Sequence, residues 1–138
     1  MNRRDFTKKT LLTGCSILTG SFSITSCKST KNILGTIQST NSILVYLDQI
    51  ADHNKVIIKN PDREAPILLY KRNDNWEATL MECTHIQCEL SLKKDLLICP
   101  CHGSTFTMEG NVLNGPAKIN LSRLHIRLTD KFLEISYN

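Results

Sequence analysis

Two short stretches dominate this sequence of 138 residues: Cys83-Thr84-His85-Ile86-Gln87-Cys88 and Cys99-Pro100-Cys101-His102-Gly103-Ser104. In each stretch a histidine follows a cysteine by two or three residues, and one further cysteine is left over. Thiolates and imidazoles are the ligands of zinc and of mixed-ligand iron–sulfur centres. The two stretches therefore predict a metal centre with four candidate ligands, Cys83, His85, Cys99 and His102.

Zinc, a set of disulfides, a hydrolase site and an iron–sulfur cluster could each use such residues. Zinc sites usually pair two cysteines before two histidines, whereas here each stretch supplies one of each. A domain held only by disulfides would not need the histidines, and a Cys–His hydrolase would need a single nucleophilic cysteine. A [2Fe–2S] cluster with histidines replacing cysteines on one iron fits both stretches, so we expect one such cluster.

The chain around the two stretches has the pattern of short strands. Apolar or alternating runs are separated by turn residues such as Asn-Pro-Asp, Asn-Asp-Asn and Asn-Gly-Pro, and no helical pattern of 10–12 residues appears. This spacing predicts an all-β sandwich or barrel over residues 42–138, with the last two runs forming a hairpin. The predicted strands are 43–47, 56–59, 66–70, 76–81, 96–99, 124–128 and 133–137.

The N-terminus resembles a twin-arginine export signal. Residues 2–8 read Asn-Arg-Arg-Asp-Phe-Thr-Lys, and a weakly apolar stretch follows over residues 10–25. A helix needs ~20 predominantly apolar residues to span a bilayer, so this stretch predicts an export signal rather than a membrane anchor. The signal is predicted to cover residues 1–26.

The end of that stretch, Ile24-Thr25-Ser26-Cys27, resembles a bacterial lipobox. Cys15 also follows suitable residues, but too few apolar residues precede it to form a signal core. We therefore predict lipid attachment at Cys27, which places the mature domain on the periplasmic side of a bacterial membrane. Residues 27–41 are rich in Ser, Thr, Asn and Lys and are predicted to form a polar tether.

The charge of the chain argues against nucleic acid as a partner. The formal net charge is +4, but residues 1–26 hold four basic residues and one acidic residue. The remaining residues are nearly balanced and show no basic stripe of the kind that nucleic-acid-binding domains carry.

The motif Cys-Thr-His-x-x-Cys, followed by Cys-Pro-Cys-His-Gly-Ser, resembles that of the Rieske family of [2Fe–2S] proteins, in particular its disulfide-containing respiratory branch. Gly115-Pro116-Ala117 resembles the proline-containing loop that covers the cluster in that family. The resemblance implies an antiparallel sandwich with a small cluster-binding subdomain of two loops, at about residues 82–117.

The resemblance also implies roles for single residues. It places the two thiolates on the inner iron and the two imidazoles on the outer iron, and it pairs Cys88 with Cys101 in a disulfide. The Ser104 hydroxyl is expected to donate a hydrogen bond to a bridging sulfide. Two positions depart from the family: Gln87 stands where respiratory members usually have glycine, and Phe106 stands where many have tyrosine. A phenylalanine ring cannot donate to a ligand sulfur, which is expected to lower the potential and weakens the case for quinol as a direct substrate.

The expected function is that of an electron carrier for a membrane or periplasmic oxidoreductase chain, with a cytochrome or another oxidoreductase subunit as partner. By itself the chain is expected to carry electrons, and any catalysis would belong to a complex of which it is a subunit. The alternative is the iron–sulfur subunit of a cytochrome bc-type, quinol-oxidising complex. The ferredoxin component of a ring-hydroxylating oxygenase is disfavoured by the extra cysteine pair and by the export signal.

Overall fold

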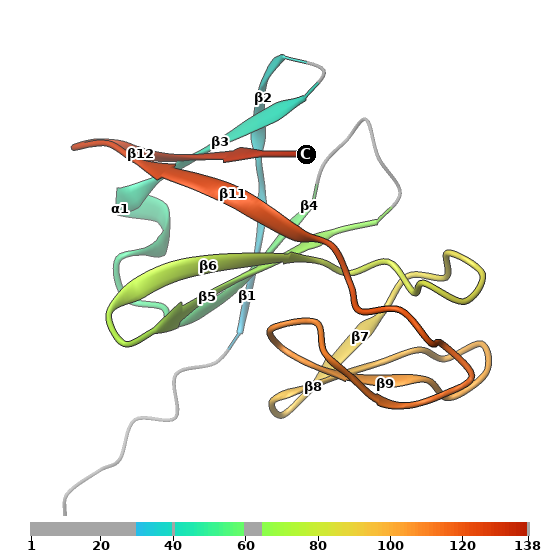
Figure 1. The fold of residues 1–138 in the computed structure, drawn as a ribbon. Helices are drawn as coiled ribbons and strands as arrows, with labels where there is room; N and C mark the ends of the chain where they lie inside the picture. The colour runs from blue at the N-terminus through green and yellow to red at the C-terminus, as the bar shows by residue number, and fades with distance from the viewer. Residues whose placement is uncertain (1–29, 40, 60–64, 138) are drawn as a thin grey trace, which may run out of the picture.

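The computed structural model describes residues 30–39, 41–59 and 65–137, and within them the chain is almost entirely β-structure (Figure 1). None of the helices in these ranges is long and apolar enough to cross a membrane. The described part of the chain forms two sheets and one short helix. The elements are β1 Lys31–Leu34, β2 Thr36–Ser39, β3 Ser42–Tyr46, α1 Leu47–Ile50, β4 Lys55–Lys59, β5 Ile67–Arg72, β6 Asn75–Leu80, β7 Ser91–Lys93, β8 Leu96–Ile98, β9 Thr105–Thr107, β10 Val112–Asn114, β11 Arg123–Leu128 and β12 Phe132–Ser136.

The larger sheet, here called the base sheet, has the strand order β1-β4-β5-β6-β11-β12-β3-β2. Its neighbouring strands are antiparallel except for the parallel pair β1 and β4. The predicted C-terminal hairpin is confirmed, because β11 pairs with β12 from His125 opposite Ser136 to Leu128 opposite Leu133. The β5–β6 hairpin turns at Asn73-Asp74, two residues with positive φ, as a tight two-residue β-turn requires.

Gly35 connects β1 to β2, the two edge strands of the base sheet. β1 and β2 form opposite edges of the sheet although only Gly35 separates them, and Figure 1 shows them as one nearly continuous strand. A Cβ atom at this position would lie 2.9 Å from Ile58 Cγ2 and closer still to Ile43 Cγ2. Any side chain here would therefore collide with these two core side chains.

The predicted tether over residues 27–41 is therefore wrong for residues 31–39, which form β1 and β2. The polar composition concealed these strands, because backbone pairing of β1 with β4 and of β2 with β3 holds them in the sheet. Ile33 adds a buried apolar side chain to the core. Residues 27–29 lie outside the described residues.

The second sheet belongs to a smaller unit, the loop subdomain, which comprises residues 81–122 between β6 and β11. Its strand order is β10-β9-β8-β7, and each of these strands has three residues. The predicted all-β fold with a separate subdomain for the two cysteine–histidine loops is confirmed. At the edge strand β10, Asn120 Oδ1 accepts a hydrogen bond from the Val112 amide at 3.0 Å, and Asn120 Nδ2 donates to Asn111 Oδ1 at 3.3 Å.

β5 separates two hydrophobic cores. Ile67 and Leu69 belong to the core of the base sheet, whereas Leu68 and Tyr70 belong to the core of the loop subdomain. All four side chains are at most 1% exposed. Successive side chains of a strand point to opposite faces, so this continuous apolar run supplies one wall of each core.

Polar contacts also join the two units. Lys55 on β4 forms an ion pair with Asp95 in the turn between β7 and β8. The Thr79 hydroxyl on β6 donates a hydrogen bond to the Met108 carbonyl at 2.7 Å. The loop subdomain is thus fixed against the base sheet from several directions.

Candidate metal centre

The first loop, residues 83–88, folds back on itself through two backbone hydrogen bonds. The Cys83 amide donates to the Cys88 carbonyl at 2.9 Å, and the Gln87 amide donates to the Cys83 carbonyl at 2.8 Å. Gln87 has a φ of 61°, which lets the chain reverse within five residues. An isolated bridge between Glu82 and Glu89 closes the base of the loop.

The second loop, residues 99–104, has the same geometry between β8 and β9. The Cys99 amide donates to the Ser104 carbonyl at 2.8 Å, and the Gly103 amide donates to the Cys99 carbonyl at 3.1 Å. Gly103 has a φ of 77° and occupies the position that Gln87 has in the first loop. Two copies of one loop conformation therefore face each other at the end of the loop subdomain.

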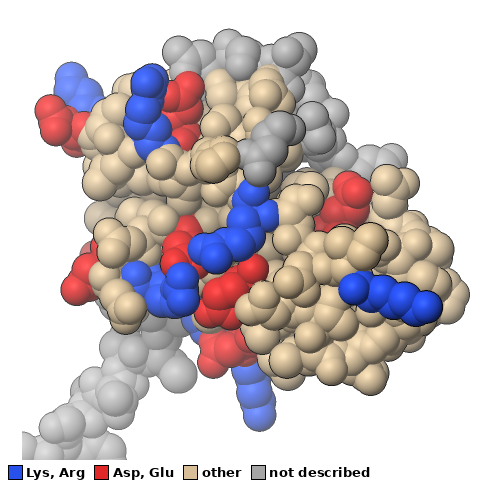
Figure 2. Space-filling view, viewed as in Figure 1, with Lys and Arg blue, Asp and Glu red and all other residues tan. Residues whose placement is uncertain are grey.

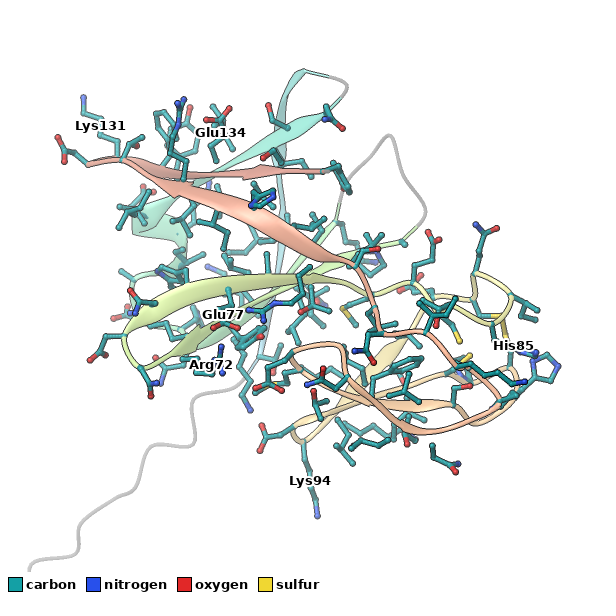
Figure 3. All side chains as sticks on the ribbon, viewed as in Figure 1. Arg72, Glu77, His85, Lys94, Lys131 and Glu134 are labelled. Atoms are coloured by element: carbon teal, nitrogen blue, oxygen red, sulfur yellow. A yellow bond between two sulfur atoms is a disulfide. The ribbon has the colours of Figure 1, made fainter. Side chains whose placement is uncertain are left out.

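The two loops place sulfur inside and imidazole outside. Cys83 and Cys99 are free thiols with 0% and 1% exposure. His85 and His102 are exposed, and their rings approach edge to face with centroids 5.0 Å apart. Figure 3 shows His85 at the far end of the loop subdomain, pointing away from the base sheet.

The predicted disulfide between Cys88 and Cys101 is confirmed, with an S–S distance of 2.05 Å. It joins the last residue of the first loop to the third residue of the second loop. The sulfur atoms of Cys88, Cys99 and Cys101 all lie within 4.8 Å of one another. Since two of them are bonded to each other, Cys99 supplies the only free thiol of this group.

Ser104, the last residue of the second loop, is fully buried. Its Oγ accepts a hydrogen bond from the Ala117 amide at 3.0 Å, directly after the exposed residues Gly115 and Pro116. Within the described residues the hydroxyl proton of Ser104 has no protein acceptor. Phe106, two residues further on, is also fully buried and packs in the same core as Cys83 and Cys99.

These residues fit a [2Fe–2S] cluster with mixed ligands. A pair of free thiols is buried in the core of the loop subdomain, the two imidazoles lie beside each other, and a buried hydroxyl ends the second loop. The Ser104 Oγ already accepts from the Ala117 amide, and the sulfide of a bound cluster would offer a second partner, as acceptor for the hydroxyl proton.

Two contacts around the site were not predicted from the sequence. The Thr84 hydroxyl, between two candidate ligands, donates to the Ile119 carbonyl at 2.5 Å. The second is the Ala117–Ser104 bond. Both join a ligand loop to the backbone of residues 115–119, and the resemblance of Gly115-Pro116-Ala117 to a covering loop is the only sequence signal that pointed there.

Several large hydrophobic side chains of the loop subdomain are exposed. Ile86, Leu113 and Ile119 are large hydrophobic residues with more than half of their surface exposed. Figure 2 shows that the side of the molecule formed by the loop subdomain is mostly uncharged, whereas acidic and basic side chains gather over the base sheet.

A network of charges lies on the wall between the two cores (Figure 3). The Tyr70 hydroxyl donates to Glu77 Oε2 at 2.7 Å, and Glu77 also pairs with Arg72 and Arg123. Partial burial alone would raise the pKa of the Glu77 carboxyl, but hydrogen bonds from Tyr70 and Arg72 and the Arg123 charge outweigh it and hold that pKa below its ordinary value. Burial, followed by the bond to Glu77, raises the pKa of the Tyr70 phenol. Glu77 is thus ionised and Tyr70 neutral near pH 7.

Several known proteins with similar sequences are iron-sulfur subunits of cytochrome complexes. The chain is 38% identical over 80 residues to the ubiquinol-cytochrome c reductase iron-sulfur subunit of Rickettsia prowazekii, covering 55% of this chain and 45% of that one. It is 40% identical over 50 residues to the cytochrome b6-f complex iron-sulfur subunit of Microcystis aeruginosa, covering 35% of this chain and 28% of that one. The chain thus spans less than half the length of these curated relatives.

The fold also matches solved structures. The cyanobacterial plasma membrane Rieske protein PetC3 from Synechocystis PCC 6803 superposes with a TM-score of 0.54 at 23% identity, over 67% of this chain and 99% of that one. Residues 44–125 match the sequence family described as the Rieske [2Fe-2S] domain. This range is more than half of the chain and contains both loops, the disulfide and Ser104. The chain belongs to the Rieske [2Fe-2S] family.

Proposed function

We propose that this protein is an electron carrier that holds one electron at a time on a [2Fe–2S] cluster bound by Cys83, His85, Cys99 and His102. When bound, the cluster supplies a one-electron couple whose mixed ligation gives a potential of about −150 to +300 mV, well above that of all-cysteine plant-type clusters. Cys83 and Cys99 hold the inner iron, and the two imidazoles hold the outer one.

The observation that carries the proposal is the contrast between buried thiols and exposed imidazoles. The two cysteines are shielded by the core of the loop subdomain, while both histidine rings lie at its exposed end, 5.0 Å apart. An electron can therefore enter or leave through the histidine side without the thiolates meeting solvent. Two thiolates also carry less negative charge than four, so an electron enters this site more readily.

We infer that the partner is a subunit of a membrane or periplasmic oxidoreductase chain, such as a cytochrome. The relatives named above are iron–sulfur subunits of cytochrome b6-f and ubiquinol-cytochrome c reductase complexes, and this supports a partner of that class. The alternative is that the chain is itself such a subunit of a quinol-oxidising complex. The buried Phe106, which cannot donate a hydrogen bond to a ligand sulfur, favours the first role.

We also propose that the protein is exported and held on the periplasmic side of a bacterial membrane by lipid at Cys27. The twin arginines, the apolar stretch and the lipobox-like residues 24–27 support this location. A twin-arginine route moves folded proteins, so a cluster could travel inside the finished domain. Cys27→Ala should release the mature domain from the membrane fraction, and a variant that stays bound after a high-salt wash would contradict the anchor.

The ligand assignment can be tested with two exposed histidines. Full-length protein made with iron available should contain about two irons and two labile sulfides per chain. His85→Ala should lose this content, whereas His125→Ala, an equally simple change on the exposed face of β11, should keep it. Stoichiometric zinc without sulfide in the unaltered protein would overturn the proposal, and so would full cluster content in His85→Ala.

A further inference from the structure

We propose that the turn between β7 and β8, which carries Lys93 and Lys94, is a docking surface for the anionic headgroups of the membrane that holds the lipid anchor. Contact at this turn holds the protein with His85 and His102 facing away from the bilayer. The inference rests on the proposed anchor at Cys27. It adds the surface that meets the lipid and the side from which a redox partner approaches.

The first step concerns how far the folded domain can lie from the lipid. β1 begins at Lys31, so only residues 28–30 separate this strand from Cys27. Whatever their conformation, four steps along an extended chain reach no further than roughly 14 Å. The headgroup layer on each side of a bilayer is itself about 5–8 Å thick. The start of β1 therefore lies at the headgroups or just above them.

The second step identifies the surface that lies beside the start of β1. β1 runs parallel to β4, and Lys31 is opposite Val56, the residue after Lys55. Lys55 in turn forms an ion pair with Asp95 in the β7–β8 turn. Figure 1 shows the start of β1 and this turn on the same side of the molecule. The anchor that brings β1 to the membrane therefore brings the β7–β8 turn there as well.

The third step concerns the charge of the turn. Lys93 and Lys94 are exposed, and neither forms an ion pair within the described residues. Figure 3 shows the Lys94 side chain extending away from the rest of the molecule. The neighbouring Asp95 carboxylate is paired with Lys55, so it does not neutralise the two ammonium groups. Lysines held this close to a bilayer are attracted by anionic headgroups.

Exposed carboxylates on the base sheet limit where this attraction acts. Asp52 lies shortly before β4, and Asp74 lies in the β5–β6 turn. Near them are Lys71 and Arg72 at the end of β5, so this part of the surface carries both signs of charge. The excess of positive charge is at the β7–β8 turn, and the docking surface is assigned to that turn alone.

The fourth step concerns the direction of the histidines. β7 and β8 form a hairpin, and the lysine turn closes one end of it. Residues 83–88 precede β7 and residues 99–104 follow β8, so both cysteine–histidine loops join the opposite end. Figure 3 shows Lys94 and His85 at different ends of the loop subdomain. With the turn on the headgroups, the imidazoles face the aqueous side. A partner that approaches through water fits this arrangement better than a quinol dissolved in the bilayer.

Rates of lysine acylation in vesicles test the contact. The lipidated, cluster-loaded protein is reconstituted in vesicles of phosphatidylcholine, with or without phosphatidylglycerol, and the acylation of each lysine is followed by peptide mass spectrometry. Lys93 and Lys94 should react about fivefold more slowly when phosphatidylglycerol is present. High salt should remove this difference without releasing the protein, because it screens the headgroup charge and leaves the lipid in place.

Two exposed lysines elsewhere provide controls in the same molecule. Lys118 lies between Ala117 and Ile119, the residues bonded to the two cysteine–histidine loops, and Lys131 lies in the β11–β12 turn. Both should react at the same rate in the two kinds of vesicle. Slowing of Lys118 in place of Lys94 would put the histidine end on the lipid and overturn the inference. Equal slowing of all four lysines, or of none, would also overturn it.

A matched pair of charge reversals tests the orientation. A [2Fe–2S] cluster that has accepted one electron has an odd number of electrons and gives an EPR signal. In oriented multilayers this signal should depend on the angle to the magnetic field for the unaltered protein and for Lys118→Glu/Lys131→Glu. Lys93→Glu/Lys94→Glu should lose most of this dependence, because the tether alone lets the protein tilt. Angular dependence that persists in this variant would contradict the docking surface.

Failures of the proposed function remain distinguishable from a failure of this inference. If Cys27→Ala stays in the membrane fraction, the anchor and the docking surface are overturned together. If the iron and sulfide counts are wrong, the cluster assignment fails while the lysine rates still report on the turn. If anchor and cluster are both correct and Lys93 and Lys94 are not protected, only the docking surface is wrong.

Discussion

The base sheet and the loop subdomain share one wall but are stabilised in different ways. The base sheet has strands of four to six residues and a core filled by alternating side chains from β3 to β6, β11 and β12. The loop subdomain has strands of three residues, and its core contains two free thiols among the apolar side chains. The comparison indicates that packing holds the base sheet, whereas cross-links and the bound cluster hold the loops.

The largest expected loss of stability comes from substitutions in β5, where two adjacent leucines face opposite cores. Leu68 and Leu69 are both fully buried, Leu68 toward the loop subdomain and Leu69 toward the base sheet. Changing either to alanine should destabilise the protein by about 2–5 kcal/mol. Only Leu68→Ala should also speed the loss of visible absorbance of the cluster in mild denaturant. Equal bleaching rates for the two variants would show that the two cores do not act separately.

Removal of the disulfide should affect the loop subdomain more than the base sheet. Cys88 and Cys101 are 13 residues apart, and closing a loop of this size contributes about 3 kcal/mol in the chain-entropy description. In the double variant Cys88→Ala/Cys101→Ala, amide hydrogen exchange should become faster in residues 83–104. Strands β3 and β12 should keep their protection. Uniform loss of protection in both units would contradict the distinction drawn between them.

The Glu77 network should give a smaller effect that depends on pH. Glu77→Gln removes a carboxylate bonded to Tyr70 and to two arginines, and we expect a loss of about 1–3 kcal/mol at pH 7. Because the folded-state pKa of Glu77 is lowered, its contribution is present above the unfolded-state pKa of ~4.3 and disappears as pH falls through the folded-state value. The difference between the two proteins should therefore shrink below about pH 4.

Tyr70 should set the alkaline limit of the pH range over which this network stabilises the protein. Its raised pKa means that the unfolded chain ionises first, so stability should decline as pH rises above ~10. Tyr70→Phe should remove this alkaline decline, and urea unfolding at several pH values measures both limits. A constant stability difference between Glu77→Gln and the unaltered protein from pH 3 to 8 would contradict the proposed charge network.

The smallest expected effects come from substitutions at matching positions of the two cysteine–histidine loops. Gln87 and Gly103 hold the same place in matched loops with positive φ, a conformation that costs an L-residue about 1–2 kcal/mol. Gln87→Gly should therefore stabilise the protein by about 0.5–1 kcal/mol after the greater freedom of glycine in the unfolded chain is counted. Gly103→Ala should destabilise the protein by a similar amount through the positive φ alone, because a Cβ at this position would meet no atom within 4 Å and so would add no clash. Thermal unfolding of both variants provides the measurement, and a destabilised Gln87→Gly would show that the glutamine side chain holds the loop.

The sequence predicted the base sheet well where strands follow a period of two. The runs that became β3 to β6, β11 and β12 alternate or stay apolar, and β8 followed from the same pattern. β1 and β2 were not predicted because their composition is polar and because they pair with strands distant from each other in the sheet, β4 and β3, which no local pattern reveals. β7, β9 and β10 are too short to show a period.

At the site, the cysteine–histidine spacing predicted the candidate ligands, and the family resemblance predicted the Cys88–Cys101 disulfide, which the structure confirms. The ligand roles themselves remain predictions. The contacts of Thr84 and Ala117 could not be predicted, because each joins a loop to a backbone atom more than ten residues away. Such bonds depend on how loops meet in space and leave no repeat in the sequence.

The edge strands of the two sheets affect how readily copies of the chain associate at high local concentration. Exposed edge strands can pair with other copies of the same chain and start aggregation. In the base sheet the two edge strands, β1 and β2, follow each other in the chain with only Gly35 between them, and at β10 the Asn120 side chain accepts the hydrogen bond of the Val112 amide. Both features reduce the strand edge that the described residues leave open, so association of copies edge to edge should be weaker than for a sheet with two long free edges.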